Sequence, residues 1–146
     1  MSGKNEIIME FSSNSENESL ARTVISAFVA RLDPTLEELA DIKTAVSEAV
    51  TNAIIHGYEK NPGMVRMAAK IEDNVVSVEI SDMGAGIENL EKAMEPMYTT
   101  KPELDRSGMG FAFMEAFMDE LDVQTELGKG TTIRMKKTIY SAIHIS

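Results

Sequence analysis

Two short glycine motifs constrain this chain more than any other feature of its sequence. The first is Asp82-Met83-Gly84-Ala85-Gly86, and the second is Gly108-Met109-Gly110-Phe111. Both follow a segment of helical periodicity that contains Glu48, Asn52 and His56. Glycines lack a Cβ atom, so they let the backbone approach a ligand closely. The order of a polar helix and two glycine-rich turns predicts an ATP site.

Length and charge limit the classes of protein that the chain can form. With 146 residues and 43% hydrophobic content, it has enough material for one core and too little for two ordinary domains. We therefore expect residues 1–146 to form a single domain. Twenty-four acidic residues against fourteen basic ones give a formal charge of −10. That charge would repel a phosphate backbone and argues against nucleic-acid binding.

The chain contains no cysteine, so disulfides and thiolate metal sites cannot stabilise it. Its first ten residues lack the apolar segment of a signal peptide, and no apolar run approaches the roughly 20 residues of a membrane span. We therefore expect a cytoplasmic protein that does not bind membranes.

Hydrophobic periodicity predicts an α+β arrangement. An N-terminal strand is indicated by apolar residues at alternate positions, namely Ile7, Met9 and Phe11. Two capping-box sequences, Ser15 with Glu18 and Thr35 with Glu38, predict the starts of two helices, the second of which is long. The remaining predicted elements are a hairpin of residues 65–71 and 76–80, an irregular loop over 95–106, a helix over 110–121, and paired strands at 123–125 and 131–135.

Glu48, Asn52 and His56 are spaced four residues apart, so on a helix they form one polar column. The amide oxygen of Asn52 suits a hard cation such as Mg²⁺, and the carboxylate of Glu48 can accept a proton or orient a hydroxyl. The alternative is a solvated face of an ordinary helix. His56 by itself is more typical of a helix end than of a metal ligand, because no second histidine lies nearby in the sequence.

Asp82 is predicted to lie at the end of a strand, where its carboxylate can accept a hydrogen bond from the exocyclic amine of adenine. Gly84 and Gly86 would let the backbone close over the base, although the same residues can form a plain turn. Gly108 and Gly110 at a helix start would offer free amides to phosphate. The complete dinucleotide-binding and P-loop patterns do not occur in the sequence.

Thr99-Thr100-Lys101 lies in the predicted loop just before the second glycine motif. Its hydroxyls and ammonium group could reach phosphate oxygens, and a solvated loop is the alternative. The eleven methionines favour adaptable packing over a metal site.

Taken together, these motifs resemble the GHKL superfamily of ATPases and kinases. Residues 48–57, 82–86, 96–101, 108–111 and 130–132 are similar to its N box, G1 box, lid, G2 box and final glycine-threonine signature. Within the superfamily, the chain resembles the anti-sigma-factor serine kinases over nearly its whole length. The likeness weakens in the first few residues and after about Lys137.

The resemblance implies a Bergerat-type fold, an α/β sandwich with a mixed, largely antiparallel sheet. It also implies a protein that binds Mg-ATP, captures a sporulation sigma factor as a homodimer, and phosphorylates a serine of an anti-anti-sigma protein. Glu48 would be the general base, Asn52 the Mg²⁺ ligand and Asp82 the residue that reads adenine. Thr99, Lys101 and Arg106 would belong to the lid. The other implied nucleotide-binding positions are Gly84, Gly86, Thr100, Gly108, Met109, Gly110 and Thr131.

Two other functions remain open at this stage: a histidine-kinase-type ATP-binding domain, and a nucleotide-gated binding module without transferase activity. The chain has no room upstream of its first strand for the dimerising helix of a histidine kinase, and Glu48 argues for retained chemistry. Arg22 lies beside the apolar stripe of the first predicted helix. We expect it to contact a sigma or anti-anti-sigma protein at the rim of an interface; an ordinary exposed arginine is the alternative.

Overall fold

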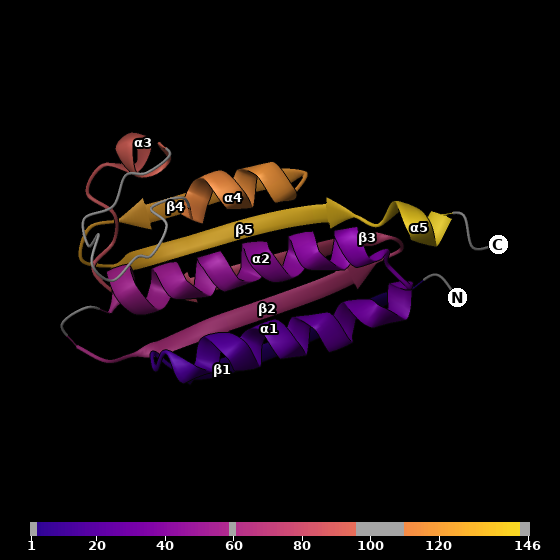
Figure 1. Ribbon diagram of the computed structural model, residues 1–146. Coiled ribbons are helices and arrows are strands. Elements are labelled where there is room, and N and C mark those ends of the chain that lie inside the picture. Colours follow the sequence, from indigo (N-terminus) through magenta and orange to yellow (C-terminus); the bar gives the residue numbers. More distant parts are fainter. Residues whose placement is uncertain (1–2, 59–60, 96–109, 144–146) are drawn as a thin grey trace.

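The computed structural model describes residues 3–58, 61–95 and 110–143, and it has two layers, with helices on one face of a five-stranded sheet (Figure 1). The strands are β1 (Lys4–Ser12), β2 (Met64–Glu72), β3 (Val75–Asp82), β4 (Glu120–Glu126) and β5 (Gly130–Thr138). The helical segments are α1 (Glu16–Val29), η1 (Ala30–Leu32), α2 (Leu36–Asn52), the π-helical turn η2 (Ala53–Gly57), α3 (Leu90–Ala93), α4 (Gly110–Phe117) and α5 (Tyr140–Ile143). The α+β sandwich expected from the sequence is confirmed.

The order of strands in the sheet is β1-β2-β3-β5-β4, and all four pairings are antiparallel. The expectation of a mixed sheet is therefore wrong for the described strands. β3 and β4 run in the same direction, but β5 is inserted between them and pairs with both. The two parallel strands consequently never become neighbours. The predicted hairpin between β2 and β3 is confirmed, and Asp73 in its turn has a positive φ of 55°.

Alternation along the strands places the core between the sheet and the helices. In β3, Val76, Val78 and Ile80 are buried, whereas the residues between them are only partly covered. Every second side chain of a strand points to the same face, so these residues all face the helical layer. Asp82 is the next member of this row and is also buried. A row of apolar core residues thus ends in a carboxylate.

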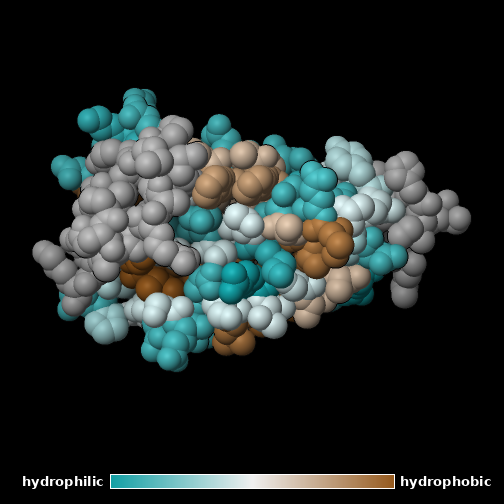
Figure 2. Space-filling view, viewed as in Figure 1, coloured by the Kyte–Doolittle hydropathy of each residue, from teal (hydrophilic) through white to brown (hydrophobic). Residues whose placement is uncertain are grey.

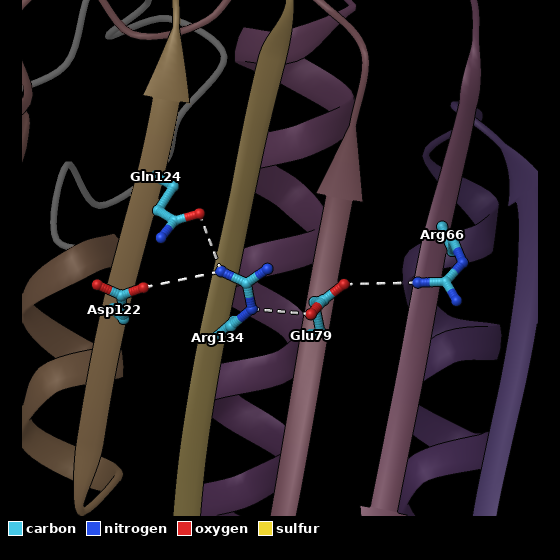
Figure 3. Close-up of polar contacts among 5 residues, drawn as sticks. All are labelled: Arg66, Glu79, Asp122, Gln124 and Arg134. Atoms are coloured by element: carbon cyan, nitrogen blue, oxygen red, sulfur yellow. Dashed lines mark hydrogen bonds and ion pairs between the residues drawn. The ribbon is translucent and has the colours of Figure 1, made fainter.

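The opposite face of the sheet carries charged side chains from four strands (Figure 3). Glu79 of β3 lies between Arg66 of β2, at 3.5 Å, and Arg134 of β5, at 2.9 Å. Arg134 also lies 3.8 Å from Asp122 and 3.0 Å from Gln124, both on β4. Solvent reaches all of these groups, so each pair contributes at most about 1 kcal/mol. The row makes one face of the sheet polar while the other is apolar.

Of the two predicted capping boxes, the structure contains one. Thr35 and Glu38 cap α2 reciprocally, through Glu38 N to Thr35 Oγ1 at 3.0 Å and Thr35 N to Glu38 Oε1 at 2.9 Å. The box at Ser15 is wrong. Ser15 directly precedes α1 with αR backbone angles, and its side chain makes no cap hydrogen bond. Its intended partner Glu18 instead accepts a hydrogen bond from the hydroxyl of Ser47 on α2. In the ranges that the structure describes, no helix has the length and apolar character needed to cross a membrane.

Glu38 also joins the start of α2 to the C-terminal segment. Its carboxylate accepts hydrogen bonds from Tyr140 N and from Ser141 Oγ, both at 2.8 Å, in addition to that from Thr35. Burial alone would raise the pKa of Glu38, but the hydrogen bonds from Thr35, Ser141 and Tyr140 outweigh it and leave the pKa below its usual value. The ionised carboxylate therefore stabilises the fold.

We expect Glu38→Gln to lower the free energy of unfolding at pH 7 by about 1 kcal/mol, because an amide NH₂ cannot accept the Tyr140 N–H. A lowered pKa gives stability that is complete above the unfolded-state pKa and is lost as the pH falls through the folded-state value. The difference between variant and wild type should therefore shrink in acid. Denaturant unfolding at several pH values measures it, with the exposed neighbour Glu37→Gln as control. A difference that is independent of pH would contradict this role.

Candidate functional site

Asp82 is the buried acid around which the candidate site is built. It ends β3, lies opposite Thr131 in the β3–β5 ladder, and its side chain is only 7% exposed. Burial raises the pKa of its carboxyl group, while hydrogen bonds from the backbones of Gly84 and Thr131 partly oppose that rise. The Gly84 N to Asp82 Oδ1 distance is 2.9 Å. A buried acceptor of this kind is costly unless a partner uses it, which is typical of a binding site.

Glycines pack closely around the end of β3 because side chains would not fit there. A Cβ atom on Gly84 would lie 1.8 Å from the carbonyl oxygen of Gly57, and one on Gly57 would lie 2.7 Å from Asp82 Oδ1. Gly86 and Gly130 have φ angles of +79° and +119°, which residues with a side chain rarely adopt. The first glycine motif is thus packed directly against the end of η2.

Backbone hydrogen bonds hold the loop after Asp82 on both sides. Ala85 N donates to Gly57 O at 2.9 Å, and Gly128 N donates to Ala85 O at 2.8 Å. Thr131, which is buried, has its hydroxyl 2.9 Å from that of Thr125, whose oxygen accepts from Ile87 N at 2.8 Å. These contacts join η2, the loop and the β4–β5 turn at one end of the molecule, at the left of Figure 1.

Glu48 and Asn52 lie four residues apart on α2, and both side chains are half-buried. A Cβ atom on Gly110 would lie 3.2 Å from Glu48 Oε2, so the carboxylate lies beside the first residue of α4. The last glycine of the second motif therefore lies beside the polar helix at Glu48. His56 belongs to the π-helical turn η2, which continues the helix beyond Asn52.

The other predicted site residues either lie outside the described residues or belong to another helix. Thr99, Thr100, Lys101, Arg106, Gly108 and Met109 lie outside the described residues. Arg22 lies on α1, where its guanidinium is 3.7 Å from Glu18.

Sequence reasoning missed two residues of the site, Gly57 and Tyr58. Gly57 provides the carbonyl that accepts from Ala85 and packs against Asp82. Tyr58 binds the backbone next to Asp82, with Met83 N donating to its hydroxyl at 2.7 Å. The available signal was a Gly-Tyr pair directly after the polar helix, which by itself is equally typical of a helix end.

Within the described ranges, no group of three His, Cys, Asp or Glu side chains could hold a metal ion. Mg²⁺ is often bound by one or two protein oxygens together with phosphate oxygens, and the half-buried amide of Asn52 suits that arrangement.

Comparison with known proteins identifies sequences and a family model that are similar to this chain. Residues 11–137 match the histidine kinase-like ATPase domain. The anti-sigma F factor of Clostridium acetobutylicum is 58% identical, over 92% of this chain and 94% of the relative. That of Geobacillus thermodenitrificans is 57% identical, over 93% of this chain and 94% of the relative.

Solved structures share the fold at low identity. The RsbU and RsbW domains of Rv1364c from Mycobacterium tuberculosis superpose with a TM-score of 0.63 at 18% identity, covering 92% of this chain and 32% of that one. The histidine kinase domain of a blue-light activated histidine kinase from Erythrobacter litoralis gives a TM-score of 0.55 at 16% identity, covering 88% of this chain and 65% of that one. The two layers are therefore arranged as in the Bergerat-type fold expected from the motifs.

The raised pKa of Asp82 predicts a pH-dependent effect of Asp82→Asn on stability. A carboxyl group whose pKa is higher in the folded than in the unfolded protein makes wild-type stability fall as the pH rises through that range. The neutral amide lacks this dependence, so the variant should gain stability relative to wild type from about pH 4 to pH 7. Thermal or denaturant unfolding across that range measures it. Asp73→Asn in the exposed β2–β3 turn removes the same charge without burial and serves as control. A relative loss with rising pH would refute it.

Proposed function

Because the chain belongs to the histidine kinase-like ATPases and, among them, to the anti-sigma F factors, we propose that it binds Mg-ATP and inhibits a sigma factor of the sigma F type that acts in sporulation. We further propose that it is a serine kinase whose substrate is the anti-anti-sigma protein that opposes this inhibition. A histidine-kinase-type domain and a non-catalytic nucleotide-gated module are the alternatives.

The observation that carries the proposal is the convergence on Asp82. A buried carboxylate, a close-packed glycine loop and the polar helix meet at one end of the sheet. The exocyclic amine of adenine donates a hydrogen bond, so ATP would satisfy the Asp82 acceptor, whereas the O6 oxygen of guanine would face it as a second acceptor. The start of α4, beside Glu48, would offer free backbone amides to phosphate.

The proposed transfer needs one general base. Glu48 would accept the proton of the substrate serine hydroxyl as the serine oxygen bonds to the γ-phosphorus. The bond from the γ-phosphorus to the bridging oxygen then breaks, and ADP leaves. Asn52 would hold Mg²⁺, which when bound neutralises phosphate charge. A carboxylate beside the expected phosphate position supports a kinase over a non-catalytic module.

The partners proposed for this chain are proteins. The helical face is mostly hydrophilic, with hydrophobic residues in separate patches (Figure 2). Arg22 is 43% exposed, pairs with Glu18 and so has one charged partner already. A basic group on a chain of charge −10 suits an acidic site on a sigma or anti-anti-sigma protein. We also propose that the protein acts as a homodimer.

Glu48→Gln and Asn52→Ala should separate transfer from binding. Because a general base acts only on the reacting hydroxyl, Glu48→Gln should lower phosphoserine formation by about 10²–10⁴-fold and leave ATP affinity near wild type. Asn52→Ala should weaken both Mg-ATP binding and transfer. The assay incubates each protein with labelled Mg-ATP and the anti-anti-sigma protein, and a substrate with its serine replaced by alanine is the control. Near-normal transfer by Glu48→Gln would remove the base assignment, and phosphohistidine instead of phosphoserine would favour the histidine-kinase alternative.

Arg22→Glu should weaken capture of the sigma factor by about tenfold or more, because it reverses a charge at the proposed interface. Nucleotide affinity should not change. Arg31→Glu makes the same charge change at an exposed position of η1 and is the matched control. Capture is measured with immobilised sigma factor. Equal capture by the two variants would reject Arg22 as a contact.

A further inference from the structure

Tyr58 fills a gap that opens between β2 and β3 beside the candidate site. The two strands pair from Glu72 with Val75 to Arg66 with Ser81. Continued by two more pairs, the same register would bring Met64 opposite Met83, but β3 ends at Asp82. The Tyr58 hydroxyl occupies that place: it donates to Met64 O at 2.7 Å and accepts from Met83 N at 2.7 Å. One side chain thus replaces a rung of the ladder.

The ring of Tyr58 is held in place by Gly63. A Cβ atom on Gly63 would lie 2.4 Å from Tyr58 Cε1, so the ring packs flat against this glycine. The backbone of Gly63 is itself fixed, because Ser13 N donates to its carbonyl at 2.8 Å and its own N–H donates to Ser13 Oγ at 3.0 Å. The glycine has little freedom to retreat, so the position of the hydroxyl is well determined.

Two consecutive residues therefore hold the loop that follows Asp82. Tyr58 binds Met83, the residue directly after the carboxylate, and Gly57 binds Ala85. The two contacts lie on either side of Gly84, whose own N–H binds Asp82 Oδ1. If Tyr58 releases Met83, the main chain adjacent to Asp82 loses its bond to β2. The direction of the carboxylate is then less well fixed.

We propose that Tyr58 is a positioning residue that sets the selectivity of the site for adenine, by holding the Asp82 carboxylate in the direction that receives the exocyclic amine. This inference rests on the proposed ATP-binding function. The inference concerns recognition of the adenine base and not of the phosphates. Tyr58 therefore affects nucleotide binding and not the transfer step.

The test is Tyr58→Phe, which keeps the ring against Gly63 and removes only the hydroxyl. ATP affinity should fall about 5- to 30-fold, the range given by losing one or two ordinary hydrogen bonds. GTP affinity should change little, so the ATP-to-GTP preference should fall by a similar factor. In the phosphorylation assay, KM for ATP should rise while kcat at saturating ATP stays within about twofold.

A second variant, Gly63→Ala, tests the same contact of the Tyr58 hydroxyl by moving the ring. Gly63→Ala keeps the hydroxyl but pushes the ring, because the fixed backbone of Gly63 cannot move away. It should also reduce the ATP-to-GTP preference. Tyr140→Phe is the matched control: it removes a hydroxyl from a side chain that is 60% exposed on α5 and should change neither preference nor KM.

Each outcome decides the question. An unchanged ATP-to-GTP preference in Tyr58→Phe overturns the inference, even if its melting temperature falls, because that pattern belongs to a purely structural tyrosine. A fall in kcat with an unchanged KM also overturns it. If wild-type protein does not prefer ATP over GTP, the proposed function of Asp82 fails first, and that result is read from the wild type alone.

Discussion

The antiparallel pairing of β3 with β5 is the constraint on which the rest of the structure depends. It sets Asp82 opposite Thr131 and continues the buried row of Val76, Val78 and Ile80 to the edge of the core. A carboxylate at that point is dehydrated by its neighbours but still reached by backbone N–H groups. The glycines follow from this placement, because the chain must turn away from the sheet within a space that the end of η2 already fills.

Much of this architecture could be predicted from the sequence because it depends on local patterns. Alternation along β2 and β3, the length of α2, the Thr35 cap and the turn at Asp73 were all correctly indicated. The Ser15 cap failed for a local and a tertiary reason: Asn14 Oδ1 accepts from Glu16 N at the start of α1, and Glu18 binds Ser47 on another helix. Insertion of β5 between β3 and β4 was likewise invisible, since it is set by packing and not by any residue in the turns.

In the candidate site, too, some residues could be predicted from local sequence and others depend on tertiary contacts. Asp82, Gly84 and Gly86 carry their signal in consecutive residues, and the structure brings them together with α2. Tyr58 carries only the ambiguous signal of a Gly-Tyr pair at a helix end, because its contacts depend on where the β2–β3 ladder stops and on the space beside Gly63. The π-helical turn that follows Asn52 was likewise not indicated by the spacing of Glu48, Asn52 and His56. The motifs therefore indicated residues of the candidate site, while the contacts that support them became visible only in the folded chain.

The position of β4 at the margin of the sheet has a consequence for self-association. An outermost strand presents unpaired N–H and C=O groups, which another chain can extend. Here the exposed positions of β4 include three carboxylates, those of Glu120, Asp122 and Glu126. Two such strands brought side by side would repel each other, so the negative charge limits growth of the sheet from this side. Neutralising these residues would leave an open template from which ordered aggregates could grow.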